Sequence, residues 1–179
     1  MEFEFDPDLE YQLEAISAVT DVFDGHPDTR RQPAFSTRGT TVPNELAISA
    51  DQLTANTRKV QRRHNLAESE DIYRAVDGEE TDLLSFSVDM ETGTGKTYVY
   101  LRTIHELYQQ YGWRKFLIIV PSVAIREGVV KTITQTRKHF DSLYSRPPFN
   151  WTEYDSSTLS DVIRFGNSNQ IQYITKPVS

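Results

Sequence analysis

Six consecutive residues, Thr92 to Thr97, constrain the fold of this chain more than any other part of its 179-residue sequence. They read Thr-Gly-Thr-Gly-Lys-Thr, and a glycine turn that ends in Lys-Thr is typical of a loop that holds the phosphates of a nucleotide. Apolar residues alternate over 83–90, which predicts a strand before the turn. A helical pattern follows over 96–111, and Gly112 ends it. The order strand, glycine turn, helix predicts an α/β fold.

The residues after the loop continue this alternation of strands and helices. The run KFLIIVPS, residues 115–122, predicts a strand buried on both faces of a parallel sheet, and residues 123–140 predict a helix. Residues 142–157 are typical of a loop, residues 158–165 of a short helix, and residues 171–175 of a third strand. We therefore expect an incomplete parallel sheet flanked by helices, in the doubly wound α/β class.

The amino-terminal part is expected to be helical at both ends and irregular between them. Residues 9–24 place apolar side chains at steps of three and four, which predicts an amphipathic helix. Residues 25–50 show no sustained period, and residues 51–66 predict a second helix with Ser49 or Asp51 as its cap. The basic residues of that helix are expected to form a solvated face, with phosphate contact as the alternative: Arg58, Lys59, Arg62 and Arg63.

The composition excludes several classes of function. Because the chain has no cysteine, it has no disulfide, no thiol nucleophile and no Cys-ligated zinc site. The formal charge of −7 argues against a protein that coats nucleic acid by bulk positive charge, so any contact with DNA would be local. The acidic amino terminus and the short apolar runs predict a cytoplasmic protein, since a membrane helix needs roughly 20 apolar residues.

Each residue type in the glycine turn has a chemical reason to be there. Gly93 and Gly95 supply the backbone conformations and the clearance that let successive amides converge on phosphate oxygens. Lys96, the candidate catalytic residue, would place its ammonium against the β- and γ-phosphates, and the Thr97 hydroxyl would be a ligand of Mg²⁺. The alternative is a glycine turn that precedes a helix and binds nothing.

Two features resemble the superfamily 2 helicases and translocases. Met90 stands where the general phosphate-loop pattern has glycine, and this variant is similar to motif I of that superfamily. Upstream, Phe5 and the Tyr11-Gln12 pair resemble the Q-motif, in which a glutamine amide reads adenine because it donates and accepts at once. The alternative for Gln12 is an ordinary exposed helix residue. The resemblance implies ATP and Mg²⁺ as cofactors, and the candidate cofactor-binding residues are Gln12, Thr92, Gly93, Thr94, Gly95, Lys96 and Thr97.

A closer resemblance extends over most of the chain. The segment from Asp89 to Ile133, together with residues 8–25, is similar to the Res (restriction) subunit of type III restriction-modification enzymes. That family implies a RecA-like, P-loop NTPase domain and an ATP-dependent, site-specific deoxyribonuclease. It also implies double-stranded DNA as substrate and a modification (methyltransferase) subunit as partner.

Residues 120–128 correspond in that family to motif Ia, which lies against the DNA strand being tracked. A helix that begins near Ser122 offers free amides, a hydroxyl and the Arg126 side chain, all of which suit a phosphate. Ser122 and Arg126 are therefore candidates for contact with DNA. The alternative for Arg126 is an ion pair with Glu127 or Asp82.

Other family motifs are not found in the sequence. No apolar strand that ends in paired acids follows residue 128, and neither an arginine finger nor a nuclease motif is recognisable. We therefore expect an amino-terminal fragment of the first motor domain: a Q-motif-like helix over 1–25, a polar insertion with a short helix over 26–80, and a truncated ATP-binding domain over 81–179. Alone, such a fragment is expected to bind adenine nucleotide weakly or not at all, to lack ATPase, translocase and nuclease activity, and to be poorly soluble.

Two other functions remain open at this point. One is another superfamily 2 DNA helicase-like ATPase, which residues 120–128 disfavour. The other is a non-catalytic nucleotide-binding module that regulates a partner. A small-molecule kinase is less suited, because nothing in the sequence resembles a lid or a phosphoacceptor site.

Overall fold

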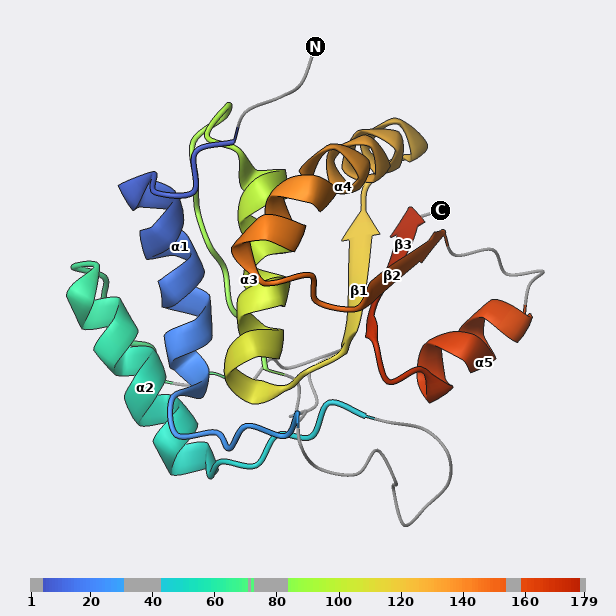
Figure 1. Ribbon diagram of the computed structural model, residues 1–179. Helices are drawn as coiled ribbons and strands as arrows, with labels where there is room; N and C mark the ends of the chain where they lie inside the picture. Colours follow the sequence, from blue (N-terminus) through green and yellow to red (C-terminus); the bar gives the residue numbers. More distant parts are fainter. Residues whose placement is uncertain (1–4, 31–42, 71, 73–83, 154–158, 178–179) are drawn as a thin grey trace.

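The protein, drawn in Figure 1 as a computed structural model, is described over residues 5–30, 43–70, 72, 84–153 and 159–177. Helices and strands follow one another along the chain in an α/β arrangement. The described strands form one parallel sheet of three, and helices pack against it. The expected class, an incomplete parallel sheet flanked by helices, is confirmed.

The sheet contains β1 (Lys115–Val120), β2 (Phe149–Glu153) and β3 (Ile171–Pro177). The strand order is β1-β3-β2, and β3 runs parallel to both neighbours. Gln172 marks the register, since it lies opposite Lys115 on one side and opposite Asn150 on the other. The third strand predicted over 171–175 is therefore present, and it is the central strand of the sheet.

The prediction of a loop over 142–157 is wrong for the middle of that range, where β2 forms. Phe149 and Trp151, two residues apart, pack against the same core, and the Phe149 ring stacks on the Tyr173 ring with 5.7 Å between centroids. A strand of 5 residues has little local pattern, so its existence depends on pairing with the distant β3.

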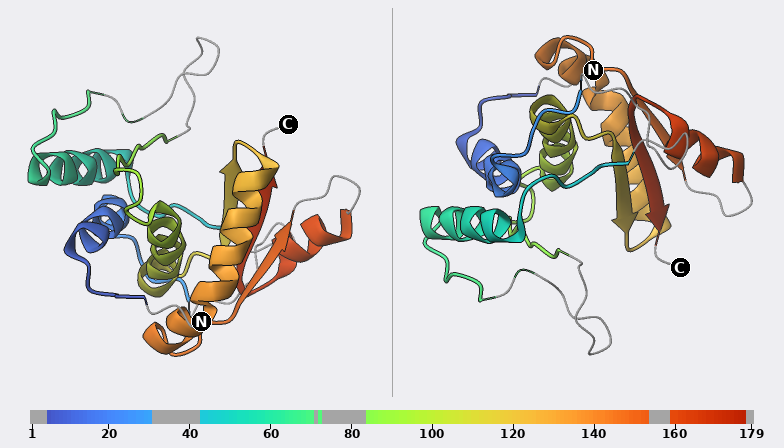
Figure 2. Two further views of the ribbon diagram at one scale, coloured as in Figure 1. Left: turned by 90° about the horizontal axis from the view of Figure 1, so that it is seen from above. Right: turned by 90° about the horizontal axis from the view of Figure 1, so that it is seen from below.

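Two helices form where the helical patterns predicted them. They are α3 (Lys96–Tyr111) and α4 (Val123–Leu143), which pack against each other, while α4 also packs on β1 and β3. The core they enclose with the sheet consists of Tyr98, Leu101, Ile104, Val120, Val129, Ile133, Phe140, Ile171 and Tyr173. The short helix predicted near the carboxyl terminus is α5 (Leu159–Asn167), which lies beyond β2 and away from α3 in both views of Figure 2.

The prediction of a strand over 83–90 is wrong for the part of that range that the structure describes, residues 84–90. Leu84 forms a single bridge, the Ser85 amide donates to the Ile72 carbonyl at 3.3 Å, and no regular structure follows up to the glycine turn. Phe86 and Val88, which alternate as a strand would require, are 40% and 45% exposed. Alternation alone does not make a strand, because extended backbone also needs a partner for its hydrogen bonds, and no described strand lies alongside.

The expectation that residues 115–122 are buried on both faces is also wrong. Phe116 and Ile118 pack against the core, but Leu117 and Ile119 point to the other face and are 54% and 60% exposed. The reason is that α4 and the core pack on one face of β1, and Leu117 and Ile119 lie on the opposite face. The continuous apolar pattern of β1 therefore leaves one apolar face open.

The amino-terminal helices confirm their sequence patterns. Residues 10–20 form α1 (Glu10–Thr20), a short 3-10 turn (Asp21–Phe23) follows, and α2 (Ala50–Arg63) comes after the irregular segment. Ser49 is the cap of α2, since its Oγ accepts from the Gln52 amide at 3.2 Å. From above and below, α1 lies between α2 and α3 (Figure 2). Among the described residues, none of the helices combines the length and apolar character that crossing a bilayer demands.

The basic residues of α2 lie near the surface in polar contacts with neighbouring segments. The ion pairs are Lys59 with Asp24, Arg62 with Glu68 and Arg63 with Asp21. Arg58 donates from Nε to the Ser69 carbonyl at 3.2 Å. These contacts support the reading of a solvated basic face.

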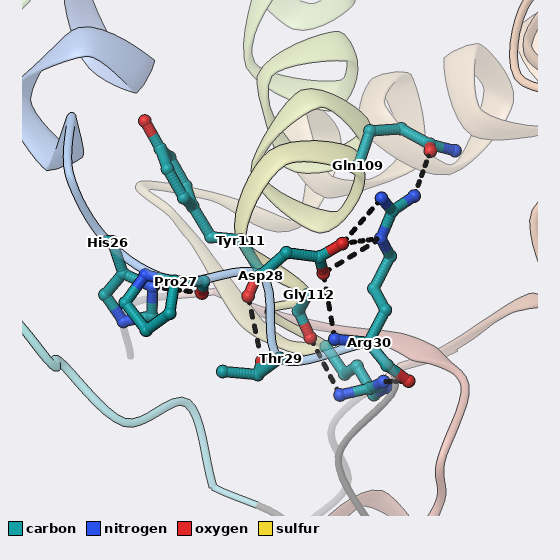
Figure 3. A network of polar contacts seen from close by, with 9 residues as sticks. His26, Pro27, Asp28, Thr29, Arg30, Gln109, Tyr111 and Gly112 are labelled. Atoms are coloured by element: carbon teal, nitrogen blue, oxygen red, sulfur yellow. Dashed lines mark hydrogen bonds and ion pairs between the residues drawn. The ribbon is translucent and has the colours of Figure 1, made fainter.

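The irregular segment after α1 is tied to the carboxyl-terminal end of α3 (Figure 3). Thr29 donates twice to the Tyr111 carbonyl, from its amide at 3.1 Å and from its hydroxyl at 2.8 Å. Arg30 pairs with Asp28 at 2.7 Å and donates to the Gln109 side chain at 2.7 Å. The segment thereby caps the end of α3 and links it to α1.

Candidate nucleotide-binding site

The glycine turn lies at the amino-terminal end of α3, on the same side of the molecule as the carboxyl end of β1 (Figure 1). Gly93 and Gly95 both have φ of 84°, in the left-handed region that favours glycine. Gly95 is the residue that precedes α3, and no side chain caps the helix there. The first turn of α3 also contains no acidic residue. Free amides and the positive end of the helix dipole therefore meet at this turn, as anion binding requires.

The Glu91 carbonyl accepts hydrogen bonds from two side chains of the turn. Lys96 donates to it from Nζ at 2.6 Å, and Thr94 donates to it from Oγ1 at 2.7 Å. Lys96 is nevertheless exposed, and so are Gly93 and Gly95. The ammonium is thus held at the surface of the turn by one backbone acceptor that a phosphate oxygen could replace.

The turn has the space that a phosphate needs. A Cβ added at Gly93 would meet no atom within 4 Å, so this side of the turn is open. A Cβ added at Gly95 would lie 2.7 Å from Nε2 of Gln12, so that side is in close contact with α1. Thr97, the candidate Mg²⁺ ligand, is half-buried in the first turn of α3. These residues fit a triphosphate on the open side of the turn.

Gln12 lies beside the turn and not at the surface. Its side chain is 6% exposed, and its Nε2 donates to the Thr94 carbonyl at 2.9 Å. The alternative reading of Gln12 as an exposed helix residue is therefore wrong. The roles of the Thr94 and Glu91 carbonyls as acceptors could not be predicted, because every residue type has a backbone carbonyl and the sequence does not show which one accepts.

The residues before α1 pack against side chains of α3. The Phe5 ring stacks on the Tyr98 ring, with 5.8 Å between centroids and 9° between planes. Arg102, which is buried, donates from Nη1 to the Pro7 carbonyl and from Nε to the Tyr144 hydroxyl. Phe5 and Gln12, both named from the sequence, thus contact the turn or its helix.

A cavity of about 880 Å³ borders the turn at Glu91 and Thr94. Its walls come from α1, α2 and residues 85–91, with apolar side chains such as Ala18, Val19 and Val60. Tyr11 lines the cavity, whereas its neighbour Gln12 points to the turn.

The two candidates for DNA contact lie at the start of α4, on the same side of the molecule as the glycine turn (Figure 1). The Ser122 hydroxyl accepts from the Ile125 amide at 3.3 Å and caps the helix. Arg126 forms ion pairs with Glu127 at 2.9 Å and with Glu153 at 3.3 Å. The pairing with Glu127 that the sequence offered as an alternative is present, and Asp82 lies outside the described residues.

No cluster of three or more His, Asp or Glu side chains suited to a metal ion occurs in the described part of the chain. The candidate Mg²⁺ ligand is thus the Thr97 hydroxyl by itself.

Comparison with known proteins gives one family. The sequence profile described as "Type III restriction enzyme, res subunit" matches residues 8–172. The match includes α1, the glycine turn and the start of α4.

Curated relatives carry the same description. The chain is 33% identical over 146 residues to the type III restriction-modification enzyme EcoPI Res subunit of Escherichia phage P1, a match that covers 80% of this chain and 14% of the relative. It is 38% identical over 104 residues to the EcoP15I Res subunit of Escherichia coli, covering 57% of this chain and 10% of the relative. The StyLTI Res subunit of Salmonella typhimurium is 51% identical over 65 residues, which is 35% of this chain and 7% of that relative. The chain thus corresponds to a small part of each relative's length.

Proposed function

Because the chain belongs to the family of type III restriction enzyme Res subunits, we propose that it forms the ATP-binding part of a DNA-translocating ATPase and endonuclease subunit. The observation that carries the proposal is the glycine turn before α3, where uncapped amides, two left-handed glycines and an exposed lysine share one open side. Such a turn is suited to a triphosphate and to few other ligands.

The chain's own residues have distinct roles in this proposal. The amides from Thr92 to Thr97 hold phosphate oxygens, and Lys96 exchanges the Glu91 carbonyl for the β- and γ-phosphates. The Thr97 hydroxyl would become a ligand of Mg²⁺, and Gln12, which lies beside the turn, would read adenine. When bound, Mg²⁺ would neutralise phosphate charge during hydrolysis.

DNA contact is the second part of the proposal. Ser122 and Arg126 would hold a backbone phosphate at the start of α4, where the helix dipole also favours an anion. Arg126 would have to exchange Glu127 and Glu153 for that phosphate. Double-stranded DNA and the modification subunit are the proposed partners of the complete enzyme, which resembles an ATP-dependent type III deoxyribonuclease.

Nucleotide binding to the chain tests the proposal. Titration calorimetry with Mg-ATP is expected to show weak binding to the wild type and none to Lys96→Ala, because the ammonium supplies the charge that faces the phosphates. Lys131→Ala, which removes an exposed lysine from α4, is the matched control and should bind like the wild type. We expect no ATP turnover by the chain alone.

Either of two results would contradict this proposal. One is an absence of ATP binding by the wild type at millimolar concentrations, and the other is equal binding by the wild type and Lys96→Ala.

A further inference from the structure

We propose that Gln12 is a positioning residue that sets the direction of a phosphate-binding amide, in addition to any contact it makes with the base. The inference rests on the proposed nucleotide site and adds a task that the sequence did not suggest. The contact that carries it joins residues 82 apart in the chain, Gln12 in the first turn of α1 and Thr94 in the glycine turn.

The hydrogen bond from Gln12 orients the peptide unit between Thr94 and Gly95. In a trans peptide the carbonyl and the following N–H point in opposite directions, and none of the described peptide bonds is cis. Nε2 of Gln12 holds the Thr94 carbonyl toward α1 at 2.9 Å. The Gly95 N–H, in the same peptide plane, is therefore turned away from α1.

The turn is open at Gly93 and in close contact with α1 at Gly95. A Cβ at Gly93 would meet nothing within 4 Å, whereas a Cβ at Gly95 would meet Gln12. By holding one carbonyl, Gln12 thus presents the Gly95 amide to a phosphate before any phosphate arrives. An amide fixed in advance binds an anion without first paying the entropy of ordering the turn.

Gln12 can do this because it is itself held in place. Its side chain is buried, so a lost hydrogen bond would leave polar groups unpaired away from water. Helix α1 packs along α3, and the residues before it are fixed by the Phe5 stack on Tyr98 and by Arg102 on the Pro7 carbonyl. The donor and the helix that follows the turn therefore move as one unit.

The binding of inorganic tripolyphosphate, which has phosphates and no base, distinguishes a positioning role of Gln12 from a role in reading the base. The variants are Gln12→Leu, which keeps the bulk and loses the donor, and Gln12→Glu, which replaces the amide donor by a carboxylate. We expect Gln12→Leu to weaken the binding of tripolyphosphate by about 3- to 10-fold, the value of one hydrogen bond, and the binding of ATP and GTP by at least that factor. Gln12→Glu should weaken the binding of all three further, because its carboxylate also repels phosphate. Glu10→Gln, at an exposed position of the same helix, should leave all three affinities unchanged. Loss of ATP binding with unchanged tripolyphosphate binding would mean base reading alone and would overturn the inference.

NMR order parameters of the backbone amides in the ligand-free protein give an independent readout. We expect Gln12→Leu to lower the order parameters of residues 93–97 while those of α1 and the rest of α3 stay as in the wild type. Unchanged order parameters in the turn overturn the inference, and so do lower values throughout α1, which would indicate a purely structural role. Because this measurement needs no ligand, it decides the role of Gln12 even if the wild type binds no triphosphate, the result that would refute the proposed function instead.

Discussion

At the scale of the residue, the two glycines of the turn differ in what surrounds them. Both have the same positive φ of 84°. Only Gly95 faces another segment, because Gln12 would lie 2.7 Å from a Cβ there. Glycine is therefore required at 93 for its conformation, and at 95 for its conformation and for the approach of α1.

Gly95→Ala is expected to be more destabilising than Gly93→Ala. The change at 93 should cost about 1–2 kcal/mol, the strain of an alanine in a left-handed conformation. The change at 95 adds the clash with Gln12. Urea unfolding of both variants, and of each with Gln12→Ala, measures the difference as a double-mutant cycle. Equal costs at 93 and 95, or no relief of the excess by Gln12→Ala, would contradict the close contact.

The burial of His105 in the core predicts that the protein becomes less stable in acid. His105 is 1% exposed, its Nε2 meets the Tyr173 hydroxyl at 2.8 Å, and burial lowers its pKa from 6.5 to about 3. The unfolded chain therefore takes up the proton first, so the contribution of His105 to stability is complete above pH 6.5 and is lost as the pH falls toward 3.

The free energy of unfolding should thus fall by up to about 1.4 kcal/mol per pH unit below pH 6.5 from this residue. His105→Gln retains a polar partner for the Tyr173 hydroxyl and does not titrate, so its stability should fall less steeply between pH 6 and about 4. Denaturant titrations across that range check this, with His64→Gln at the end of α2 as the control. A wild-type slope retained in His105→Gln would refute the assignment.

At the scale of the element, the helices could be predicted and the strands only in part. The patterns of α3 and α4 depend on neighbours three and four residues away, which the sequence displays directly. The strands depend on partners far along the chain. Residues 85–90 continue the alternating pattern without pairing with a strand of the described sheet, whereas 149–153 show little pattern and pair with β3. The same limit hid the bond between Gln12 and Thr94, although both residues were named as candidates.

The end of α3 offers a test of how tightly the irregular segment is attached. Gly112 has φ of 79°, and a Cβ there would lie 2.5 Å from the Arg30 amide nitrogen. Gly25 also has a positive φ, 90°, but a Cβ there would meet nothing within 4 Å. Gly25→Ala should cost about 1–2 kcal/mol from strain alone.

Gly112→Ala should cost more than Gly25→Ala, because it also pushes Thr29 and Arg30 away from α3 and breaks the bonds drawn in Figure 3. Thermal unfolding of the two variants gives the comparison. If Gly112→Ala were no more destabilising than Gly25→Ala, the packing of residues 29–30 on α3 would be wrong.

At the scale of the whole molecule, β1 presents exposed apolar side chains on the face that does not pack against the core. Leu117 and Ile119 are exposed there, and Val162 and Ile163 of α5 are exposed as well. An open apolar face of this kind promotes association between copies of a protein. The expectation of poor solubility therefore has a structural cause in β1.

Leu117→Thr combined with Ile119→Thr should reduce self-association without unfolding the protein. Threonine is β-branched, which suits a strand, and the side chains of Leu117 and Ile119 both point away from the core. Light scattering against protein concentration measures the association, and circular dichroism confirms the fold. Phe116→Thr and Ile118→Thr, on the covered face, should instead unfold the chain. Unchanged scattering in the double variant would mean that this face is not the one that associates.

The position of β3 in the sheet sets an order of events during synthesis. β1 and β2 do not touch each other, and β3, which bridges them, is the last of the three to leave the ribosome. Until then neither β1 nor β2 has a neighbour in the sheet. Helices α3 and α4 must therefore pack together while part of their apolar surface is still exposed to water. A nascent chain of this protein therefore depends on its helices alone until the residues of β3 emerge.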